Sequence, residues 1–362
     1  MRMNNIKGKY FMNSRRKFLQ AGALGLGAMS LSKQLFAAHH EFVAPTLAGR
    51  PVRTVDIHAH CVFPEVAEIV NGTPFERGFN PSQVLGDRRI EQMNALGLEY
   101  QALSVNTYWW YGADESMAAE VVSAHDAGLA AWVNQHPDRF VALSSVALQF
   151  PELAAEQLEY AVTELGHRGA SVGGHVMGEE PTSEKYDPFW AKAQELGVPV
   201  FMHPGGADNV IMDGTLAGRG DLGNIIGNPL ETTIFLTKMI FDGVLDRFPG
   251  LKVCGAHGGG YLPSYLGRAE VACQVRGNAN CANLKLPSEY LRTQIYADSM
   301  VFSHEGLRHL VSEMGPTQVV YGTDLPFNWP DTMQLILEAS YLTEEEKRAI
   351  LGGNLSNLLN IA

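Results

Sequence analysis

Apolar residues recur along this chain in short continuous runs that are bounded by polar or turn-forming residues. Eight such runs follow one another after residue 53, and most of them lack an alternation of polar and apolar positions. Continuous runs of this length are typical of parallel strands that are buried on both faces. The predicted strands span residues 54–60, 100–106, 140–148, 169–176, 199–203, 252–258, 294–299 and 318–324.

The stretches between these runs have the spacing of amphipathic helices. Examples are residues 83–95, 117–134, 151–165, 188–196, 232–248 and 261–275. Strands that alternate with helices eight times predict an α/β fold, a (β/α)8 TIM barrel over residues 39–362. Thr343 and the acidic residues after it predict the start of further helices over 343–361, which close the barrel.

Three longer stretches lack a clear period and are predicted to be loops. They are residues 63–82, 106–116 and 205–229, which follow the first, second and fifth predicted strands. Loops after the strands of such a barrel surround its mouth, so we expect these three to shape a binding site.

Residues of metal-ligand type stand at the ends of several predicted strands. His58 and His60 are two apart on the first strand, which places both side chains on the same face. His203 ends the fifth strand and Asp324 ends the eighth. Because strand ends in a barrel meet at one mouth, we expect these four residues to bind one metal ion. Each residue alone has a structural explanation, and Asp324 in Thr-Asp-Leu-Pro also fits a turn.

His257 ends the sixth predicted strand, in the segment Ala-His-Gly-Gly-Gly. The glycines leave space for a ligand or another part of the backbone to come close. We interpret His257 as a general acid/base beside the metal, and the alternative is a histidine held in place by hydrogen bonds alone. His175, near the end of the fourth strand, fits a structural, a metal-supporting or a substrate-contacting role equally well.

The first 38 residues differ in composition from the rest of the chain. They hold no Asp or Glu, and Arg15 and Arg16 precede an apolar run over 21–31 that is followed by Ala37 and Ala38. This order resembles a twin-arginine export signal. The run is shorter than the roughly 20 apolar residues that span a bilayer. We expect residues 1–38 to be removed and the protein to be periplasmic or extracellular; an uncleaved arm is the alternative.

Without this segment, 324 residues remain, with 20 Lys and Arg against 39 Asp and Glu, a formal net charge of −19. So acidic a protein should repel nucleic acid and anionic membrane surfaces. Among the cysteines, Cys273 and Cys281 are close in sequence and form the candidate disulfide of an exported protein. We expect Cys61 and Cys254 to be small buried hydrophobic residues rather than metal ligands.

Taken together, these motifs resemble the amidohydrolase superfamily, in its branch related to aminocarboxymuconate-semialdehyde decarboxylase. The similarity covers nearly all of residues 39–362. Its most specific part is 227–268, with Asn-Pro-Leu-Glu-Thr-Thr at 228–233, Asp-Arg-Phe-Pro-Gly at 246–250 and His-Gly-Gly-Gly at 257–260. The segments Asp-Ile-His-Ala-His, Met-His-Pro and Gly-Thr-Asp, which end at residues 60, 204 and 324, fit the same branch.

The resemblance implies a single metal ion, usually zinc with manganese as an alternative, bound by His58, His60, His203 and Asp324, with water completing the shell. It implies that His257 activates this water and shuttles a proton, and that Asp324 accepts one. Binuclear relatives use a lysine on the fourth strand to bridge two ions, and the fourth predicted strand here contains no lysine.

The resemblance also bears on the substrate. Arg268 matches an arginine that reaches the substrate carboxylate of a neighbouring subunit, which implies a homodimer; a surface salt bridge is the alternative. A second substrate-binding arginine has no clear counterpart, because Arg77 stands in a different context. The aromatic cluster at 108–111 suggests that Trp109 and Trp110 contact a flat apolar substrate, and packing between loops explains it equally well.

The function implied is that of a metal-dependent non-oxidative decarboxylase of a small carboxylated aromatic or unsaturated acid. A hydrolase of an ester, lactone, amide or C–C bond that uses the same site is the alternative. A periplasmic metal- or ligand-binding protein is a third possibility, against which the intact His257 argues.

Overall fold

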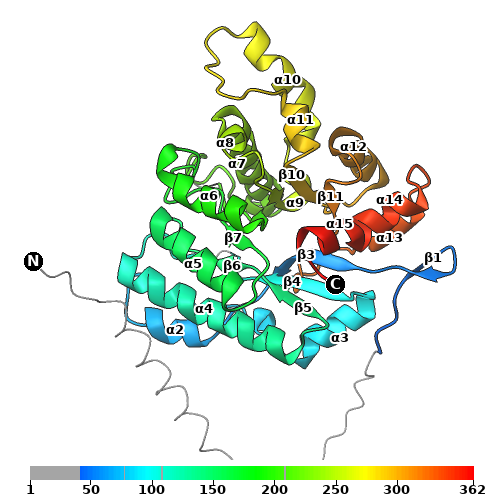
Figure 1. Cartoon of the computed structure of the whole chain (residues 1–362), viewed down its shortest axis with the longest axis horizontal. Coiled ribbons are helices and arrows are strands. Elements are labelled where there is room, and N and C mark those ends of the chain that lie inside the picture. Colours follow the sequence, from blue (N-terminus) through cyan, green and yellow to red (C-terminus); the bar gives the residue numbers. More distant parts are fainter. Residues whose placement is uncertain (1–40, 77, 107–108, 208) are drawn as a thin grey trace, which may run out of the picture. The chain divides into compact units, whose positions relative to one another are not determined.

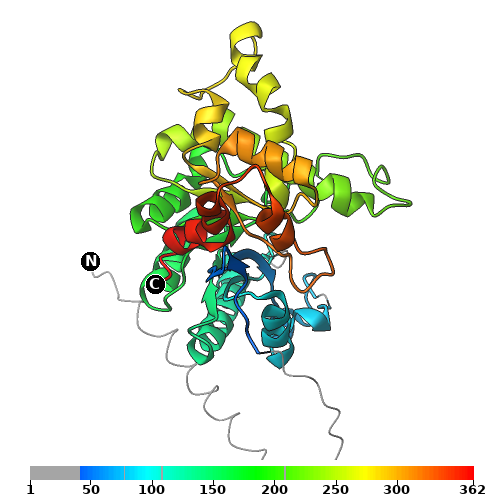
Figure 2. The same cartoon turned by 90° about the vertical axis from the view of Figure 1, so that its right-hand side faces the viewer.

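The computed structural model of the protein describes residues 41–362, except for 77, 107–108 and 208. The predicted export signal, residues 1–38, and the first of the loop aromatics, Tyr108, lie outside the described residues. In the described part, helices surround a central set of parallel strands (Figure 1, Figure 2). Within the same residues, no helix combines the length and the apolar character needed to cross a membrane.

The barrel strands pair in chain order and are parallel. The third strand consists of two pieces joined at Leu143, whose N–H donates to Leu103 O at 2.9 Å. The strands are β3 (Val55–His60), β4 (Tyr100–Ser104), β5 (Phe140–Ala142) with β6 (Ser144–Ser145), β7 (Ala170–Val172), β8 (Val200–Met202), β9 (Val253–Gly255), β10 (Ile295–Asp298) and β11 (Val319–Val320).

The last strand returns to the first and closes the barrel. Ile57 N–H donates to Tyr321 O at 3.1 Å, and Asp324 N–H donates to His58 O at 2.8 Å. A parallel bridge between Ala59 and Leu325 continues this pairing. The predicted (β/α)8 barrel is therefore confirmed.

Each predicted run contains a barrel strand, but the observed strands are shorter. The run 318–324 contributes only Val319–Val320 to β11. The chain turns out of the ladder before the run ends, and Asp324 has a φ of 61°, a left-handed conformation that no extended strand contains. Local departures of this kind at the barrel mouth set the directions in which the strand-end side chains point.

The helices around the barrel are α3 (Asp87–Leu96), α4 (Glu115–Gln135), α5 (Pro151–Thr163), α6 (Asp187–Leu196), α7 (Asn228–Phe241), α8 (Val244–Arg247), α10 (Leu266–Val275) and α12 (His304–Met314). Shorter helices follow: α11 (Pro287–Leu291), α13 (Met333–Glu338), α14 (Glu344–Arg348) and α15 (Asn354–Leu358). The predicted helix start at Thr343 is confirmed, because its hydroxyl accepts from Glu346 N–H and the Glu346 carboxylate accepts from Thr343 N–H.

Two of the three predicted loops contain helical segments, so the prediction of irregular structure was wrong there. Residues 63–82 include α2 (Glu65–Val70), and 205–229 include the π-helix η3 (Gly223–Gly227). α2 has only six residues, too few to be stable alone. Its buried Val66 and Val70 belong to an apolar cluster with residues of α4, so tertiary packing rather than local sequence stabilises it.

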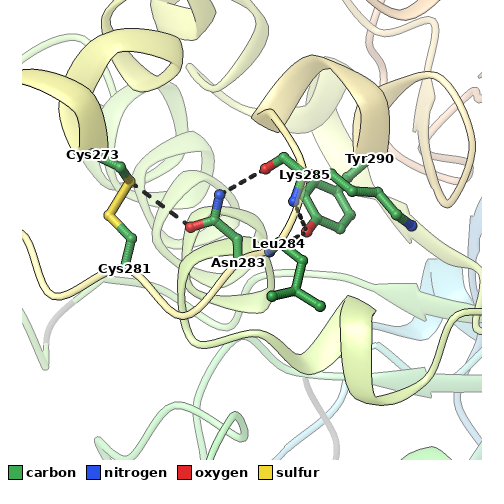
Figure 3. The surroundings of a disulfide bond; sticks show 6 residues. All are labelled: Cys273, Cys281, Asn283, Leu284, Lys285 and Tyr290. Carbon is green, nitrogen blue, oxygen red and sulfur yellow. Dashed lines mark hydrogen bonds between the residues drawn. A yellow bond between two sulfur atoms is a disulfide. The ribbon is translucent and has the colours of Figure 1, made fainter.

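The predicted disulfide joins Cys273, in α10, to Cys281 in the segment after it (Figure 3). That segment is anchored on the barrel side, since Ala282 N–H donates to Phe241 O at 2.8 Å and Leu284 N–H donates to the Asp246 carboxylate at 2.9 Å. The disulfide thus connects the end of α10 to chain that is hydrogen-bonded to α7 and α8. The other cysteines, Cys61 and Cys254, are buried and free, as expected.

Candidate metal centre

The four predicted ligands converge at the mouth of the barrel. His58 and His60 come from β3, His203 follows β8, and Asp324 follows β11. One ligand atom from each lies within 4.8 Å of the others, and all four residues are buried. The ring of His203 is 4.9 Å from that of His58 and 4.6 Å from that of His60, measured between centroids. A period of two along β3 and the closure of the barrel together produce this cluster.

The atoms that face one another in this cluster lack ordinary partners. Within the described residues, no hydrogen bond satisfies His58 Nε2, His60 Nε2, His203 Nδ1 or Asp324 Oδ1, although all are buried. Asp324 Oδ1 lies 3.2 Å from His58 Nε2 and 2.7 Å from His60 Nε2. Buried polar atoms are nearly always paired, so a convergent set of unpaired nitrogen and oxygen atoms fits a bound cation. The residues present therefore form a metal-binding site.

Burial and the neighbouring carboxylates determine the protonation states of the cluster. Burial lowers the pKa of both His60 and His203 below the usual value, which leaves their rings neutral with a free lone pair. Burial opposes ionisation of Asp324, but the nearby His58 outweighs it and holds the carboxyl pKa well below its usual range. For His58, burial is likewise outweighed by the nearby Asp324 and Asp298, which raise its pKa to about 10, so binding of a metal ion through His58 must release a proton.

His257 lies beside the cluster in a tight turn. Its ring centroid is 5.1 Å from that of His58 and 5.4 Å from that of His203. His257 Nδ1 is buried and has no hydrogen-bond partner among the described residues. Burial, together with the charge of His58, lowers the pKa of His257 to about 4. The ring is therefore neutral at pH 7 and has an unoccupied nitrogen that can accept a proton.

A second buried carboxylate, Asp56, holds the strands under the cluster together. It accepts from His58 N–H at 2.9 Å, from Gln101 Nε2 at 2.8 Å, and from both the N–H and the hydroxyl of Thr323. These donors belong to β3, β4 and the chain after β11. Asp56 thus fixes the relative positions of the strands that carry three of the four ligands.

The sequence profile of the Amidohydrolase family matches residues 55–359, which contain the whole metal cluster. The chain belongs to the amidohydrolase family. This amidohydrolase is 32% identical over 288 residues to 2-amino-3-carboxymuconate-6-semialdehyde decarboxylase of Dictyostelium discoideum, with 76% of each chain covered. It is 29% identical to gamma-resorcylate decarboxylase of Polaromonas sp., which covers 76% of this chain and 87% of the relative.

A solved structure has the same fold as this amidohydrolase. It is that of dihydroxybenzoic acid decarboxylase from Polaromonas sp., with bound manganese and the inhibitor 2-nitroresorcinol. It superimposes with a TM-score of 0.73 and 25% identity over 86% of this chain and 97% of the other. The family resemblance read from the motifs is therefore confirmed.

Trp109 and Trp110, which the sequence suggested as substrate contacts, lie in different environments. Trp109 Nε1 donates to Ser171 O at 3.1 Å, and its ring stacks on that of Tyr111 with centroids 5.9 Å apart. A Cβ on Gly205, just after the ligand His203, would lie 3.9 Å from the Trp109 ring, so this tryptophan stands close to the mouth. Trp110 instead donates to Phe75 O and packs in the apolar cluster of α2 and α4.

His175 and Arg268 lie in different surroundings from the metal cluster. His175 Nδ1 accepts from Gly178 N–H at 3.0 Å, and Nε2 lies 3.4 Å from Gly206 O. Beside it the buried carboxylate of Glu231 accepts from Gly174 N–H and Gly206 N–H. The Glu231 carboxylate therefore connects the loops after β7 and β8. Arg268 is exposed on α10.

Two further residues at the cluster were not predicted from the sequence. Asp298, the last residue of β10, lies 2.6 Å from His58 Nδ1. Phe327, in the loop after β11, places its ring 4.9 Å from that of His60, edge to face. Asp298 stands next to the end of a predicted strand, close to where His203 and Asp324 stand on theirs, and this is the signal that could have revealed it. Phe327 follows Asp324 by three residues, but nothing in the sequence alone assigns its direction.

Proposed function

We propose that this amidohydrolase is a metal-dependent, non-oxidative decarboxylase of a small carboxylated aromatic or unsaturated acid. The observation that carries the proposal is the neutral, unpaired His257 beside a four-ligand cluster inside the barrel mouth. That both relatives and the solved structure are named decarboxylases supports the choice of reaction. The metal would be held by His58, His60, His203 and Asp324, and when bound it supplies positive charge that orients and polarises an anionic substrate.

The remaining chemistry falls to residues of the chain. Decarboxylation replaces a C–CO₂⁻ bond by a C–H bond, so the electron pair of the broken bond stays on the carbon and a proton must reach it. His257 Nδ1 is buried without a partner in a ring that lies beside the cluster, and its pKa of about 4 makes the protonated ring a strong acid. We assign the transfer of this proton to His257. Because the ring is neutral at rest, it takes up the proton from solvent only once an anionic acid is bound beside it, and that solvent proton replaces the CO₂ that leaves.

Aromatic side chains near the cluster suit a flat substrate. The Trp109 ring lies close to Gly205 in the loop after β8, and Phe327 lies edge-on to His60 and is 37% exposed. Rings in such positions bind a planar acid by stacking and by edge contacts. We propose Trp109 and Phe327 as substrate contacts, with Trp110 and His175 supporting the walls behind them.

Product analysis tests this function. The metal-loaded protein is incubated with hydroxybenzoates, muconate-type acids, lactones and aryl esters, while release of CO₂ and release of acid are followed in parallel. We expect metal-dependent CO₂ release from at least one carboxylated acid, and its loss in His257→Asn. Acid release without CO₂ would instead identify a hydrolase at the same site and overturn the proposal.

For the metal we propose Zn²⁺, because three imidazoles and one carboxylate suit it. The same ligands accept Mn²⁺, the ion bound in the solved dihydroxybenzoic acid decarboxylase. Elemental analysis of protein purified without added metal, followed by reconstitution of the stripped protein with each ion, decides between them. Full activity with Mn²⁺ and none with Zn²⁺ would reject zinc.

We also propose that the protein is exported and dimeric. The basic and apolar segments within residues 1–38 support twin-arginine export. Tyr265, just before α10, and Arg268, Val271 and Val275 within it are exposed and follow a helical spacing along one face, which supports contact with a second copy. N-terminal sequencing of periplasmic protein tests the first point. Light scattering of the mature protein and of Val271→Asp tests the second.

A further inference from the structure

Asp298 is hydrogen-bonded both to the metal ligand His58 and to the turn that carries His257. Its side chain is fully buried at the end of β10 and takes part in four hydrogen bonds. Oδ2 lies 2.6 Å from His58 Nδ1 and accepts from His257 N–H at 2.9 Å. Oδ1 accepts from Gly258 N–H at 2.8 Å and from Met300 N–H at 3.1 Å.

We propose that Asp298 is a positioning residue that orients the metal ligand His58 and, at the same time, fixes the turn that carries His257. The inference deepens the proposed function and rests on it for the role of His257. It concerns the coupling of metal binding to proton transfer through one carboxylate.

The effect of Asp298 on the metal ligand His58 follows from the chemistry of a carboxylate. Ionised Asp298 can only accept hydrogen bonds, so a His58 ring that gives up one proton to bind a metal ion keeps the other on Nδ1. The lone pair of His58 is then on Nε2, which faces Asp324 Oδ1 at 3.2 Å in the ligand cluster. A carboxylate behind a ligating imidazole fixes both its tautomer and its ring orientation.

The effect of Asp298 on the turn at residues 257–260 follows from backbone strain. His257 has a φ of 55°, and Gly258, Gly259 and Gly260 after it have φ values of 65°, 72° and 64°. A histidine in this left-handed region costs about 1–2 kcal/mol relative to ordinary backbone. Asp298 accepts the first two N–H groups of the turn, and a run of N–H groups pointing at one anion is a favourable arrangement. The carboxylate that orients His58 therefore also holds His257 in its strained position.

An amide cannot replace this carboxylate. If the amide of the Asp298→Asn variant placed its oxygen at the Oδ2 position, its NH₂ would face the N–H groups of Gly258 and Met300. In the reverse orientation the NH₂ would face His257 N–H and force His58 to accept at Nδ1, which moves its proton to Nε2 and removes the metal lone pair. Asp298→Asn is close in shape to the native residue and yet disrupts one or both connections.

Asp126, in α4, provides a control. It is also a buried aspartate packed against the barrel, but it accepts from the Ser144 hydroxyl at 2.6 Å and from Ser145 N–H at 3.3 Å, both in β6, rather than from residues of the cluster. Asp126→Asn should change stability without changing the tautomer of His58. A comparison of the two variants therefore separates positioning from general destabilisation.

The experiment measures Zn²⁺ affinity by competition with a chelating indicator, alongside circular dichroism and thermal unfolding. We expect Asp298→Asn to weaken Zn²⁺ binding 10- to 100-fold while the fold is retained, and Asp126→Asn to stay within threefold of the native affinity. Equal Zn²⁺ affinities of the native protein and Asp298→Asn would overturn the inference. Because no substrate is used, this outcome is independent of whether the enzyme is a decarboxylase.

Two further readouts complete the test. With saturating Zn²⁺, Asp298→Asn should lower kcat more than it changes KM, and should cost little more in a His257→Asn background. Fully additive losses would contradict the coupling. If Asp298→Asn does not fold, the native zinc-loaded protein with ¹⁵N-labelled histidine still decides: His58 must show a protonated Nδ1 that exchanges slowly, and a protonated Nε2 refutes the inference.

Discussion

The turn after His257 can be tested by comparing the stability effects of alanine at two adjacent glycines, Gly259 and Gly260. Gly260 has a φ of 64° and a ψ of −135°, a region that only glycine occupies readily. A Cβ added there would lie 2.3 Å from Pro229 O and 2.6 Å from Thr233 Oγ1, at the start of α7. The neighbouring Gly259 also has a positive φ, but a Cβ there would come no closer than 3.4 Å to another atom, Ala297 Cβ.

Alanine at the two positions should therefore have different effects. In Gly259→Ala we expect only the left-handed strain, about 1–2 kcal/mol. In Gly260→Ala the strain is about 1–3 kcal/mol, and overpacking against the backbone of α7 adds about 1–3 kcal/mol. The methyl group also displaces the Thr233 hydroxyl, which accepts from Tyr261 N–H at 2.7 Å. At the centres of these ranges, the expected difference between the variants is about 2.5 kcal/mol in the free energy of unfolding.

Urea unfolding of the metal-loaded protein, followed by circular dichroism, measures this difference through the transition midpoints. Gly260→Ala should also lose activity, since the clash moves the turn that carries His257, whereas Gly259→Ala should retain most of it. Equal stabilities of the two variants would refute the argument, because the close approach of this turn to α7 is the feature on which the expected difference rests.

Other predictions concern the site and the buried carboxyl group of Asp126. His257→Asn should lower kcat at least about 100-fold with an unchanged metal content, as measured by kinetics and elemental analysis. Removal of the metal with a chelator should abolish activity and lower Tm, and added Zn²⁺ should restore both in a concentration-dependent way. Trp109→Ala should raise KM for an aromatic acid more than it lowers kcat. Burial raises the pKa of Asp126 to about 7 from 3.8, so the native state retains a proton that the unfolded state loses and stability falls as pH rises through this window. Asp126→Asn should therefore stabilise the protein more at pH 8 than at pH 4, by a difference on the order of 4 kcal/mol at most; a pH-independent effect in urea unfolding would contradict this.

Much of the site was predictable because it depends on periodicity and chain order. A period of two places His58 and His60 together, and barrel closure brings in His203 and Asp324 from strands far along the chain. The helix after Thr343 was predictable for a similar reason, since a capping box is a local interaction between residues three apart.

Other features depend on contacts that no local pattern encodes. Asp298 meets His58 across 240 residues of sequence, and only the folded barrel shows that its carboxylate points at an imidazole rather than at a helix end. The short helix α2 forms because Val66 and Val70 find apolar partners on α4. Trp109 and Trp110 are adjacent and identical, yet one stands near the mouth and the other packs behind it, which depends on the course of the loop between β4 and α4.

The Cys273–Cys281 disulfide has a practical consequence for anyone who prepares this protein. It closes a ring across eight positions of sequence, and chain entropy assigns about 2–3 kcal/mol to a ring of that size. Material made in a reducing cytoplasm lacks this crosslink, and the helix that bears Arg268 then loses its tether to α7 and α8. Assays on reduced and oxidised samples therefore compare two forms of the enzyme. The thiol content of each preparation should be measured and reported together with its activity.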